Sequence, residues 1–226
     1  MSRWILALIL CVSAFVAGCA EGLFWKAGHY SPWAREKWES EDQQVDTLFA
    51  RKRQLNELVE RAQQAPAAER DKAAMQLKEI VHRDPIILVR LHAVGLLPEI
   101  PSTESIEALK LASRDPDSRV RKAAIDAWSK IQGPVSIAQL QEFIGSDTDV
   151  DVRLHATKAL GTFDDPSAAN ALSLALTDTN PAIQFRATES LEKVTGEKIG
   201  ADVAAWQNYL DDQNRQSTAS LDSTIR

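Results

Sequence analysis

Apolar residues between positions 70 and 196 recur with the 3.6-residue period of an α-helix, and the pattern occurs four times. Each copy can be aligned on one apolar anchor, and the anchors are Val89, Val120, Val152 and Ile183. An aspartate stands five residues before every anchor, at Asp84, Asp115, Asp147 and Asp178. An alanine stands four residues after every anchor, at Ala93, Ala124, Ala156 and Ala187. The spacings of 31, 32 and 31 residues are typical of a solenoid of stacked repeats.

Each copy contains two amphipathic segments separated by a turn. The first segment has an apolar residue nine positions before the anchor, at Ile80, Leu111, Phe143 and Leu174. The second has one eight positions after the anchor, at Leu97, Trp128, Leu160 and Leu191. The aspartates and the residues that follow them supply helix-stop and N-cap chemistry between the segments. The pattern predicts helix, turn, helix, and the alanines let helix axes approach to the near end of the ~8–10 Å packing range.

These units resemble the HEAT-repeat family, in particular the short HEAT-like repeats of phycobilisome lyases. The resemblance rests on Asp-Pro followed by Val-Arg and an Ala- and Leu-rich helix, as in Asp84-Pro85 with Val89-Arg90. The second and third copies agree through Val120-Arg121 and Val152-Arg153, whereas Gln184 replaces the arginine in the fourth. The resemblance implies an all-α, right-handed α-solenoid of about four repeats. It implies little about activity, because the family includes enzymes, scaffolds and transport adaptors.

The sequence predicts six segments. Residues 1–18 are a signal peptide, 19–39 an aromatic-rich segment that begins with a lipidated cysteine, and 40–65 an N-terminal capping helix. The repeats occupy 70–196, a C-terminal capping helix 197–211 and a disordered tail 212–226. Ser31-Pro32 is typical of a helix start, so helical sequence can begin there and continue to Gln64. The capping helix carries an apolar stripe, and a coiled-coil partner helix is the alternative interpretation.

The first residues indicate export. A positive start at Arg3 is followed by the uncharged run Trp4 to Ala17, which is shorter than the ~20 residues of a membrane span. The run ends in Val16-Ala17-Gly18-Cys19, which resembles the lipobox of bacterial lipoproteins; an ordinary secretory signal is the alternative. The resemblance implies that Cys19 is lipidated and becomes the new N-terminus. Alanine rather than aspartate follows Cys19, which favours an outer-membrane or periplasm-facing address in the cell envelope.

Cysteine and aromatic residues add to this picture. Cys11 lies in the removed segment, so Cys19 would be the one cysteine of the mature chain and could form no intramolecular disulfide. Aromatic residues crowd the segment that follows, including Trp25, Trp33 and Trp38. They either cap the first repeat or contact the membrane interface. This segment resembles those of predicted lipoproteins from planctomycete-type bacteria.

Charge and motifs narrow the expected functions. The net charge of −6 becomes −7 when residues 1–18 and their one positive charge, Arg3, are removed, which argues against a nucleic-acid partner. The chain lacks the usual nucleophile, phosphate-loop, zinc-protease and paired-cysteine motifs. We therefore expect no catalytic residue, no metal, no cofactor and no small-molecule substrate, and we expect that the protein is not an enzyme.

The second helices carry recurring basic residues. His92 and His155 occupy equivalent positions two repeats apart, about 20 Å by the stacking distance, so they cannot share an ion. The family resemblance implies that the arginines pair with the aspartates in a ladder that links turns and adjacent repeats, and such exposed ion pairs are expected to set register more than stability. As an alternative role, a basic ridge could bind an acidic segment of a protein partner. Its residues are Arg90, His92, Arg121, Lys122, Arg153, His155 and Arg186.

The sequence thus predicts a lipid-anchored scaffold or adaptor that binds one or more proteins of unknown identity at the cell envelope, contacting the membrane through Cys19. The alternative is an enzyme or enzyme accessory related to the HEAT-like lyases. Export counts against a lyase of that kind, because bilin attachment takes place in the cytoplasm. A third interpretation is a structural element that bridges membrane and wall.

Overall fold

The computed structural model describes the backbone of residues 32–224 and the side chains of residues 47–216. The predictions for residues 1–18 and for Cys19 lie outside these residues. Residues 1–51 and 52–226 form two separate compact units, and the second unit contains the repeats. Helix α3 crosses the boundary and runs from Pro32 to Gln63.

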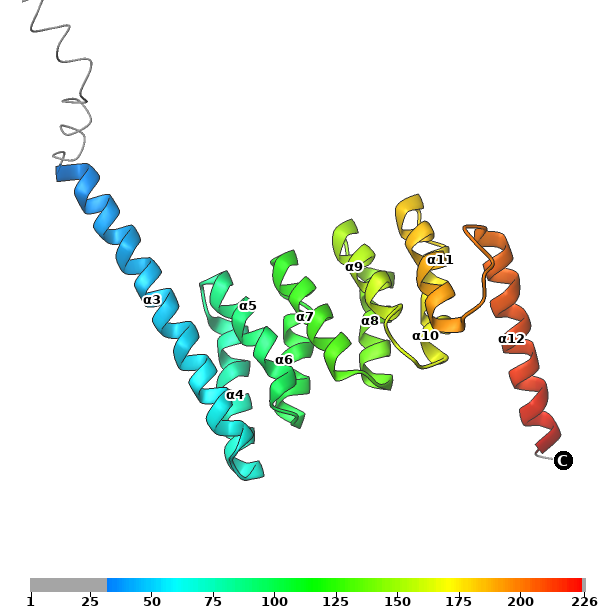
Figure 1. The fold of residues 1–226 in the computed structure, drawn as a ribbon, viewed down its shortest axis with the longest axis horizontal. Coiled ribbons are helices and arrows are strands. Elements are labelled where there is room, and N and C mark those ends of the chain that lie inside the picture. The colour runs from blue at the N-terminus through cyan, green and yellow to red at the C-terminus, as the bar shows by residue number, and fades with distance from the viewer. Residues whose placement is uncertain (1–31, 225–226) are drawn as a thin grey trace, which may run out of the picture. The chain divides into compact units, whose positions relative to one another are not determined.

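The described chain is helical and contains no strand (Figure 1). After α3 the elements are α4 (Ala67–Arg83), α5 (Ile87–Leu96), the short 3₁₀ helix η1 (Leu97–Glu99), α6 (Thr103–Ala112), α7 (Ser118–Ile131), α8 (Pro134–Ser146), α9 (Val150–Leu160), α10 (Ser167–Leu176), α11 (Pro181–Thr195) and α12 (Val203–Thr224). The helices from α4 to α11 are the four predicted pairs. The prediction of an all-α solenoid is confirmed.

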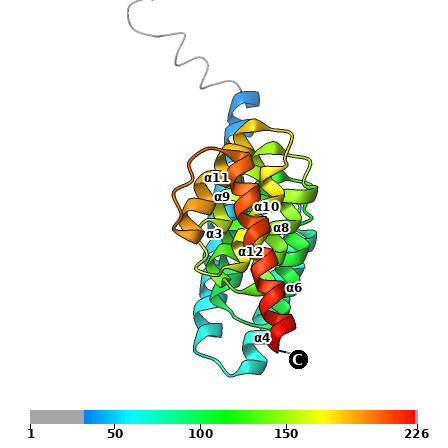
Figure 2. The same ribbon diagram turned by 90° about the vertical axis from the view of Figure 1, so that its right-hand side faces the viewer.

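The paired helices form two layers (Figures 1 and 2). The first helices of the repeats are α4, α6, α8 and α10, and the second helices are α5, α7, α9 and α11. Within the second layer α5 packs against α7, α7 against α9, and α9 against α11. Each helix also packs against the other helix of its own repeat. This stacking buries one continuous core between the layers.

The repeated apolar positions form this core as the period requires. The four anchors and the four alanines are fully buried. Trp128 and Leu160 are buried eight positions after their anchors, about two turns further along the same helix face. The methyl groups of the alanines therefore lie inside the core between packed helices.

The turns differ in one detail from the prediction. The N-cap of the second helix stands three residues before the anchor, two residues after the recurring aspartate. Asp117 caps α7 by accepting a hydrogen bond from the Arg119 N–H, and Asp149 and Asn180 cap α9 and α11 in the same way. The recurring aspartates close the turn instead, because each side chain accepts the N–H of the residue two positions on, at 2.8–2.9 Å.

Helices cover both ends of the array. Leu55, Val59 and Ala62 on α3 are buried. At the other end α12 packs against α10 and α11 and buries Trp206, whose Nε1–H donates a hydrogen bond to the Gly200 carbonyl at 2.9 Å.

Both covering helices are longer than the expected capping segments. Helix α3 begins at Pro32, as the Ser31-Pro32 pair indicates, and ends at Gln63. Helix α12 continues to Thr224, so the prediction of a disordered tail from residue 212 is wrong for the described residues. The physical reason is that no glycine or proline interrupts the chain after Leu210, although its composition is polar.

Candidate functional site

An arginine and an aspartate join each repeat to the next at the turn end of the array. In the gap between the second and third repeats, Arg121 Nε donates to Asp147 Oδ2 at 2.7 Å and its Nη2 donates to Oδ1 at 2.9 Å. The other two gaps contain the same pair, Arg90 with Asp115 and Arg153 with Asp178, each with an Nε to Oδ2 distance of 2.8 Å. We call these three pairs the ladder. Their two-point geometry fixes the direction as well as the distance of each contact.

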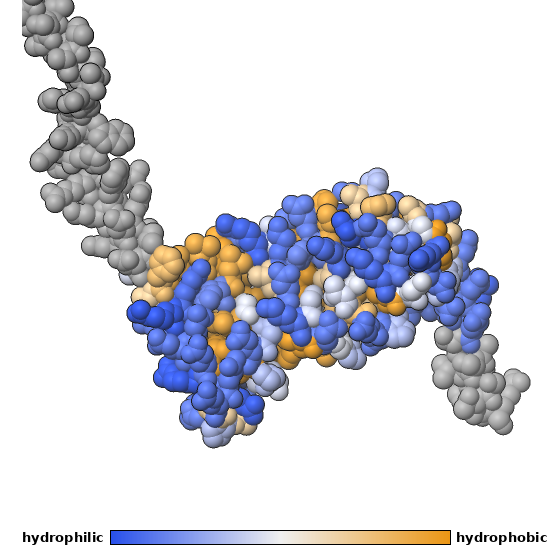
Figure 3. Space-filling model, in the orientation of Figure 1, coloured by the Kyte–Doolittle hydropathy of each residue, from blue (hydrophilic) through white to orange (hydrophobic). Residues whose placement is uncertain are grey.

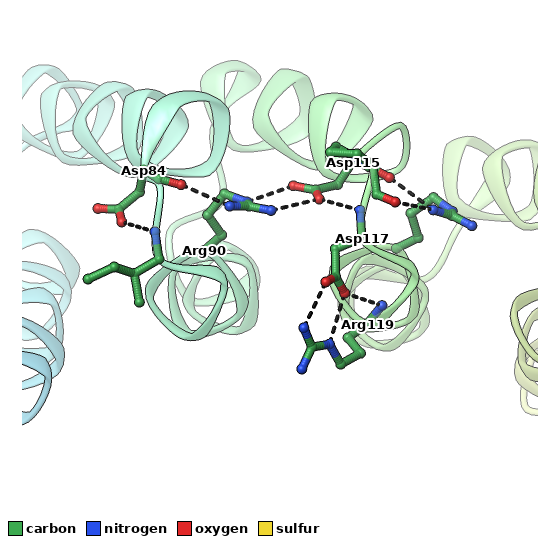
Figure 4. Close-up of polar contacts among 8 residues, drawn as sticks. Asp84, Arg90, Asp115, Asp117 and Arg119 are labelled. Carbon is green, nitrogen blue, oxygen red and sulfur yellow. Dashed lines mark hydrogen bonds and ion pairs between the residues drawn. The ribbon is translucent and has the colours of Figure 1, made fainter. Parts of the chain in front are cut away.

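Each ladder arginine also binds the turn of its own repeat. Arg90 Nη1 donates to the Asp84 carbonyl at 2.9 Å (Figure 4). Arg121 Nη1 donates to the Asp115 carbonyl at 3.0 Å. Arg153 does the same with the Asp147 carbonyl at 3.0 Å. One guanidinium group therefore holds two consecutive turns, and its planar set of donors is what makes this possible.

The ladder is buried, contrary to the expectation of exposed ion pairs. The side chains of Arg121 and Asp147 are 14% and 6% exposed, and the other two pairs are similar. Asp147 Oδ1 also accepts the Asp149 N–H, so the carboxylate is bound by backbone and side chain together. Removing one partner of such a pair leaves an uncompensated buried charge. The ladder therefore contributes to the stability of the array and does more than set its register.

Gln184 ends the ladder. It stands at the arginine position of the fourth repeat, and its Nε2 donates to the Asp178 carbonyl at 2.9 Å. This is the bond that each arginine makes to its own turn. A glutamine keeps that bond but has no second arm to reach a further repeat, and α12 follows instead of a fifth helix-turn-helix unit.

The pairing changes the ionisation of its members. The hydrogen bond to Asp147 raises the pKa of Arg121 against the opposing effect of burial, and Asp115 acts on Arg90 likewise. Burial by itself raises the pKa of Asp178. The hydrogen bonds from Arg153 and from the Asn180 N–H together lower this pKa by more than burial raises it, so the net pKa lies below its usual value. Arg90, Arg121 and Asp178 therefore stay charged at neutral pH.

The structure does not bring the seven basic-ridge residues together as one accessible cationic surface. Three of them are the ladder arginines. His92 Nε2 lies 2.8 Å from Asn56 Oδ1 on α3, and burial together with Lys52 lowers the pKa of His92. The remaining members divide as follows: His155 Nε2 lies 2.6 Å from Asp126 Oδ1 on α7, Arg186 pairs with Glu189 on its own helix, and Lys122 is half-buried.

The outward side of the second helices carries a row that the sequence analysis did not single out. It lies two positions after each anchor, about 200° around the helix from the core, and consists of Leu91, Lys122, Leu154 and Phe185. We call it the outer row. Phe185 is 52% exposed, and Val150 near Leu154 on α9 is 40% exposed. Reading the position two after the anchor, in addition to the buried positions, would have found this row.

Hydrophilic residues cover most of the face seen in Figure 3, with smaller hydrophobic areas between them. Within the described part of the chain, no three His, Cys, Asp or Glu residues are grouped so that they could hold a metal ion. None of the described helices combines the length and the apolar character that crossing a membrane requires.

Comparisons with known proteins agree with this architecture. The family model for HEAT repeats matches residues 74–156 and 142–220. Among solved structures, human deoxyhypusine hydroxylase in complex with glycerol is similar at 19% identity and a TM-score of 0.49. The match covers 55% of this chain and 44% of the human chain, so this chain spans less than half of that protein. No significant match was found among curated protein sequences.

The expectation that the protein is not an enzyme has to be corrected. It rested on the view that solenoids mostly present surfaces and on missing motifs. Deoxyhypusine hydroxylase is an enzyme by its name, and part of it is similar to this chain. The fold is therefore no ground for ruling out catalysis.

We predict that Arg121→Gln destabilises the protein by about 2–4 kcal/mol, because Asp147 then stays buried without its charged partner. The new glutamine can still bind the turn of its own repeat, as Gln184 does. Arg119→Gln is the matched control: Arg119 pairs with Asp117 on the surface at 2.8 Å, and its loss should cost less than about 0.5 kcal/mol. Denaturant unfolding followed by circular dichroism measures both, and equal effects would contradict a special role of the ladder.

We predict a pH dependence that comes from Asp178. Its pKa is lowered in the folded protein, so its contribution to stability is present above the unfolded value of about 3.9 and is lost as the pH falls through the folded pKa. Asp178→Asn should reduce the slope of unfolding free energy against pH in the acid range, by up to about 1.4 kcal/mol per pH unit. The exposed Asp151→Asn is the control. Parallel slopes for wild type and Asp178→Asn would refute the assignment.

Proposed function

This chain belongs to the HEAT-repeat family, and we propose that it is a protein-binding scaffold held at a cell-envelope membrane by a lipid on Cys19. HEAT repeats commonly mediate protein–protein interaction.

The outer row is the observation that carries the binding surface. Of its apolar members Phe185 is exposed, whereas Leu91 and Leu154 are half-buried. The exposed Phe185 and Val150 lie on the neighbouring helices α11 and α9. Aromatic side chains are enriched in protein interfaces, and charged residues are depleted at interface centres. We infer that α9 and α11 present the centre of the partner surface.

The predicted basic ridge takes a smaller part in this proposal. Its arginines are bound in the ladder, so their charges hold repeats together. Lys122 lies in the outer row, and Arg186 follows Phe185 directly, so these two remain candidates for the polar rim of the same surface. A rim charge of this kind mainly affects the association rate and its salt dependence.

The sequence supports the anchor. A charged start, an uncharged run and the Val16-Ala17-Gly18-Cys19 motif precede the helices, and Cys19 would be left as the one cysteine after cleavage. A diacylated or triacylated cysteine binds a bilayer durably, whereas a single acyl chain does so only marginally. The location that we propose is the outer membrane or another envelope membrane facing the periplasm.

We predict that Cys19→Ser abolishes labelling of the protein with radioactive palmitate in its native host and moves it from the membrane fraction to the soluble fraction. The reason is that the thiol is the acylation site in the proposed lipobox. An unlabelled wild-type protein would overturn the proposed lipid anchor on Cys19, whether or not the protein binds a partner.

We predict that a photo-crosslinking amino acid at Phe185 gives a discrete adduct with an envelope protein in intact cells. The same amino acid at Val135 is the control, because Val135 is 51% exposed but lies on α8 in the other layer. Mass spectrometry of the adduct identifies the partner. Adducts of equal yield from both positions, or none from Phe185, would argue against the outer row as the binding surface.

A further inference from the structure

The first layer of helices is not packed evenly along the array. Helix α6 packs closely against α4, and α8 packs closely against α10. Between α6 and α8, which belong to consecutive repeats, the described backbones hardly approach each other. The second layer has no such break, because α5, α7, α9 and α11 each pack against the next helix of that layer. The array therefore consists of a first half, α4 to α7, and a second half, α8 to α11, that meet mainly through α7 and α9.

The connection between the two halves has an unusual backbone. Residues 97–102 connect α5 to α6 and residues 161–166 connect α9 to α10, whereas only Gln132 and Gly133 connect α7 to α8. Gln132 has a φ of 60° and a ψ of −179°, a region that is essentially confined to glycine, and Gly133 has a φ of 87°. Among the described residues, Gln132 is the one residue other than glycine with a positive φ. This two-residue connection sets the direction in which α8 leaves α7, and it leaves α8 apart from α6.

A hollow of about 280 Å³ lies in the gap between the C-terminal ends of α6 and α8. Arg114 lines it from the end of α6, and Glu142 and Phe143 line it from α8. Arg114 Nη2 donates to Glu142 Oε1 across the gap at 3.3 Å, and the two side chains are 76% and 48% exposed. Exposed ion pairs contribute little to stability. A weak contact therefore closes the first layer at this gap.

The contacts on the other side of the gap are much stronger. Arg121 on α7 binds Asp147, which precedes α9, at 2.7 and 2.9 Å, and both side chains are buried. This pair and the packing of α7 against α9 keep the two halves from separating or sliding. A rotation about the contact between α7 and α9 moves α6 and α8 the most. It changes the buried pair the least, because Arg121 lies on α7 itself.

We propose that the array bends at this joint, where its two halves rotate about the contact between α7 and α9 and the gap between α6 and α8 opens and closes. Hinges absorb such motion in a few residues at the ends of elements, and here Gln132 and Gly133 are those residues. The Arg114 and Glu142 pair is the latch of the closed state, and the Arg121 and Asp147 pair is the pivot.

Bending at the joint changes the shape of the outer row. Leu91 and Lys122 lie on the first half, and Leu154 and Phe185 lie on the second. Opening of the gap therefore alters the separation of these two parts of the row, while the spacing within each half stays fixed. The bending belongs to the fold and involves neither the lipid nor a partner. Its failure leaves the proposed function standing.

Distances between spin labels, measured by double electron–electron resonance, test the bending. The protein is the full chain with Cys11→Ser and Cys19→Ser, so that labels attach only to introduced cysteines. Asp71→Cys on α4 and Asn170→Cys on α10 place one label on each half, and both positions are exposed. We expect a distance distribution about twice as broad as that of a label pair within one half, because μs–ms hinge motion is frozen out as a spread of distances.

Two label pairs within single halves are the matched controls, and all their positions are exposed. Asp71→Cys with Lys130→Cys reports on α4 and α7 of the first half. Gln141→Cys with Lys193→Cys reports on α8 and α11 of the second half. Both distributions should be narrow. Equal widths for the pair across the joint and the pairs within the halves would overturn the proposal.

A charge reversal tests the latch. Arg114→Glu places two carboxylates opposite each other, and it should raise the share of the longer distances across the joint by about two- to five-fold. Adding Glu142→Arg rebuilds the pair in reverse and should restore the wild-type distribution. The thermal unfolding midpoints should stay within a few degrees, which shows that the variants fold. A distribution unchanged by Arg114→Glu, or widened without rescue by the second substitution, would overturn the assignment of this pair as the latch.

Discussion

The contact on which the rest of the structure depends is the one between an arginine and the aspartate of the next turn. A stack of helix pairs held by apolar contacts alone could slide or rotate, because hydrophobic burial is not directional. In each gap of this array a planar guanidinium group binds a carboxylate at two points and binds its own turn at a third. The carboxylate is itself fixed by the backbone N–H two residues on. Each repeat is therefore oriented by the turn of its neighbour, and the buried ladder pairs hold successive repeats in this orientation.

Much of this could be predicted from the sequence, and the reason is the regular period. The anchors, the alanines and the helix pairs follow from spacing alone, and the family model matches the same region. Gln184 was also visible as a departure from the pattern. The sequence does not show the hydrogen bond that Gln184 keeps to the turn of its own repeat. The ladder between adjacent repeats was expected from the family resemblance, but its burial was missed, because residue spacing does not show how far the packed helices enclose these side chains.

On the second helices, consecutive residues after the anchor point in different directions and therefore have different contacts. The anchor points into the core, and the next residue points along the stack into the ladder. The residue after that faces outward, as Leu154 and Phe185 do, and the one after that contacts an adjacent helix, as His155 does. Three of the seven basic-ridge residues are therefore explained by the ladder. The arginines are prominent in the sequence because the architecture needs them, and the positions free to serve a partner are those whose residues vary between repeats.

The same ladder also shapes the turn edge of repeats two to four. Arg121 and Asp147 line one hollow of about 280 Å³ there, and Asp147, Arg153 and Asp178 line a second of about 330 Å³, so the contacts that orient the repeats also shape these hollows. A surface whose shape is set before a ligand arrives loses less conformational entropy on binding.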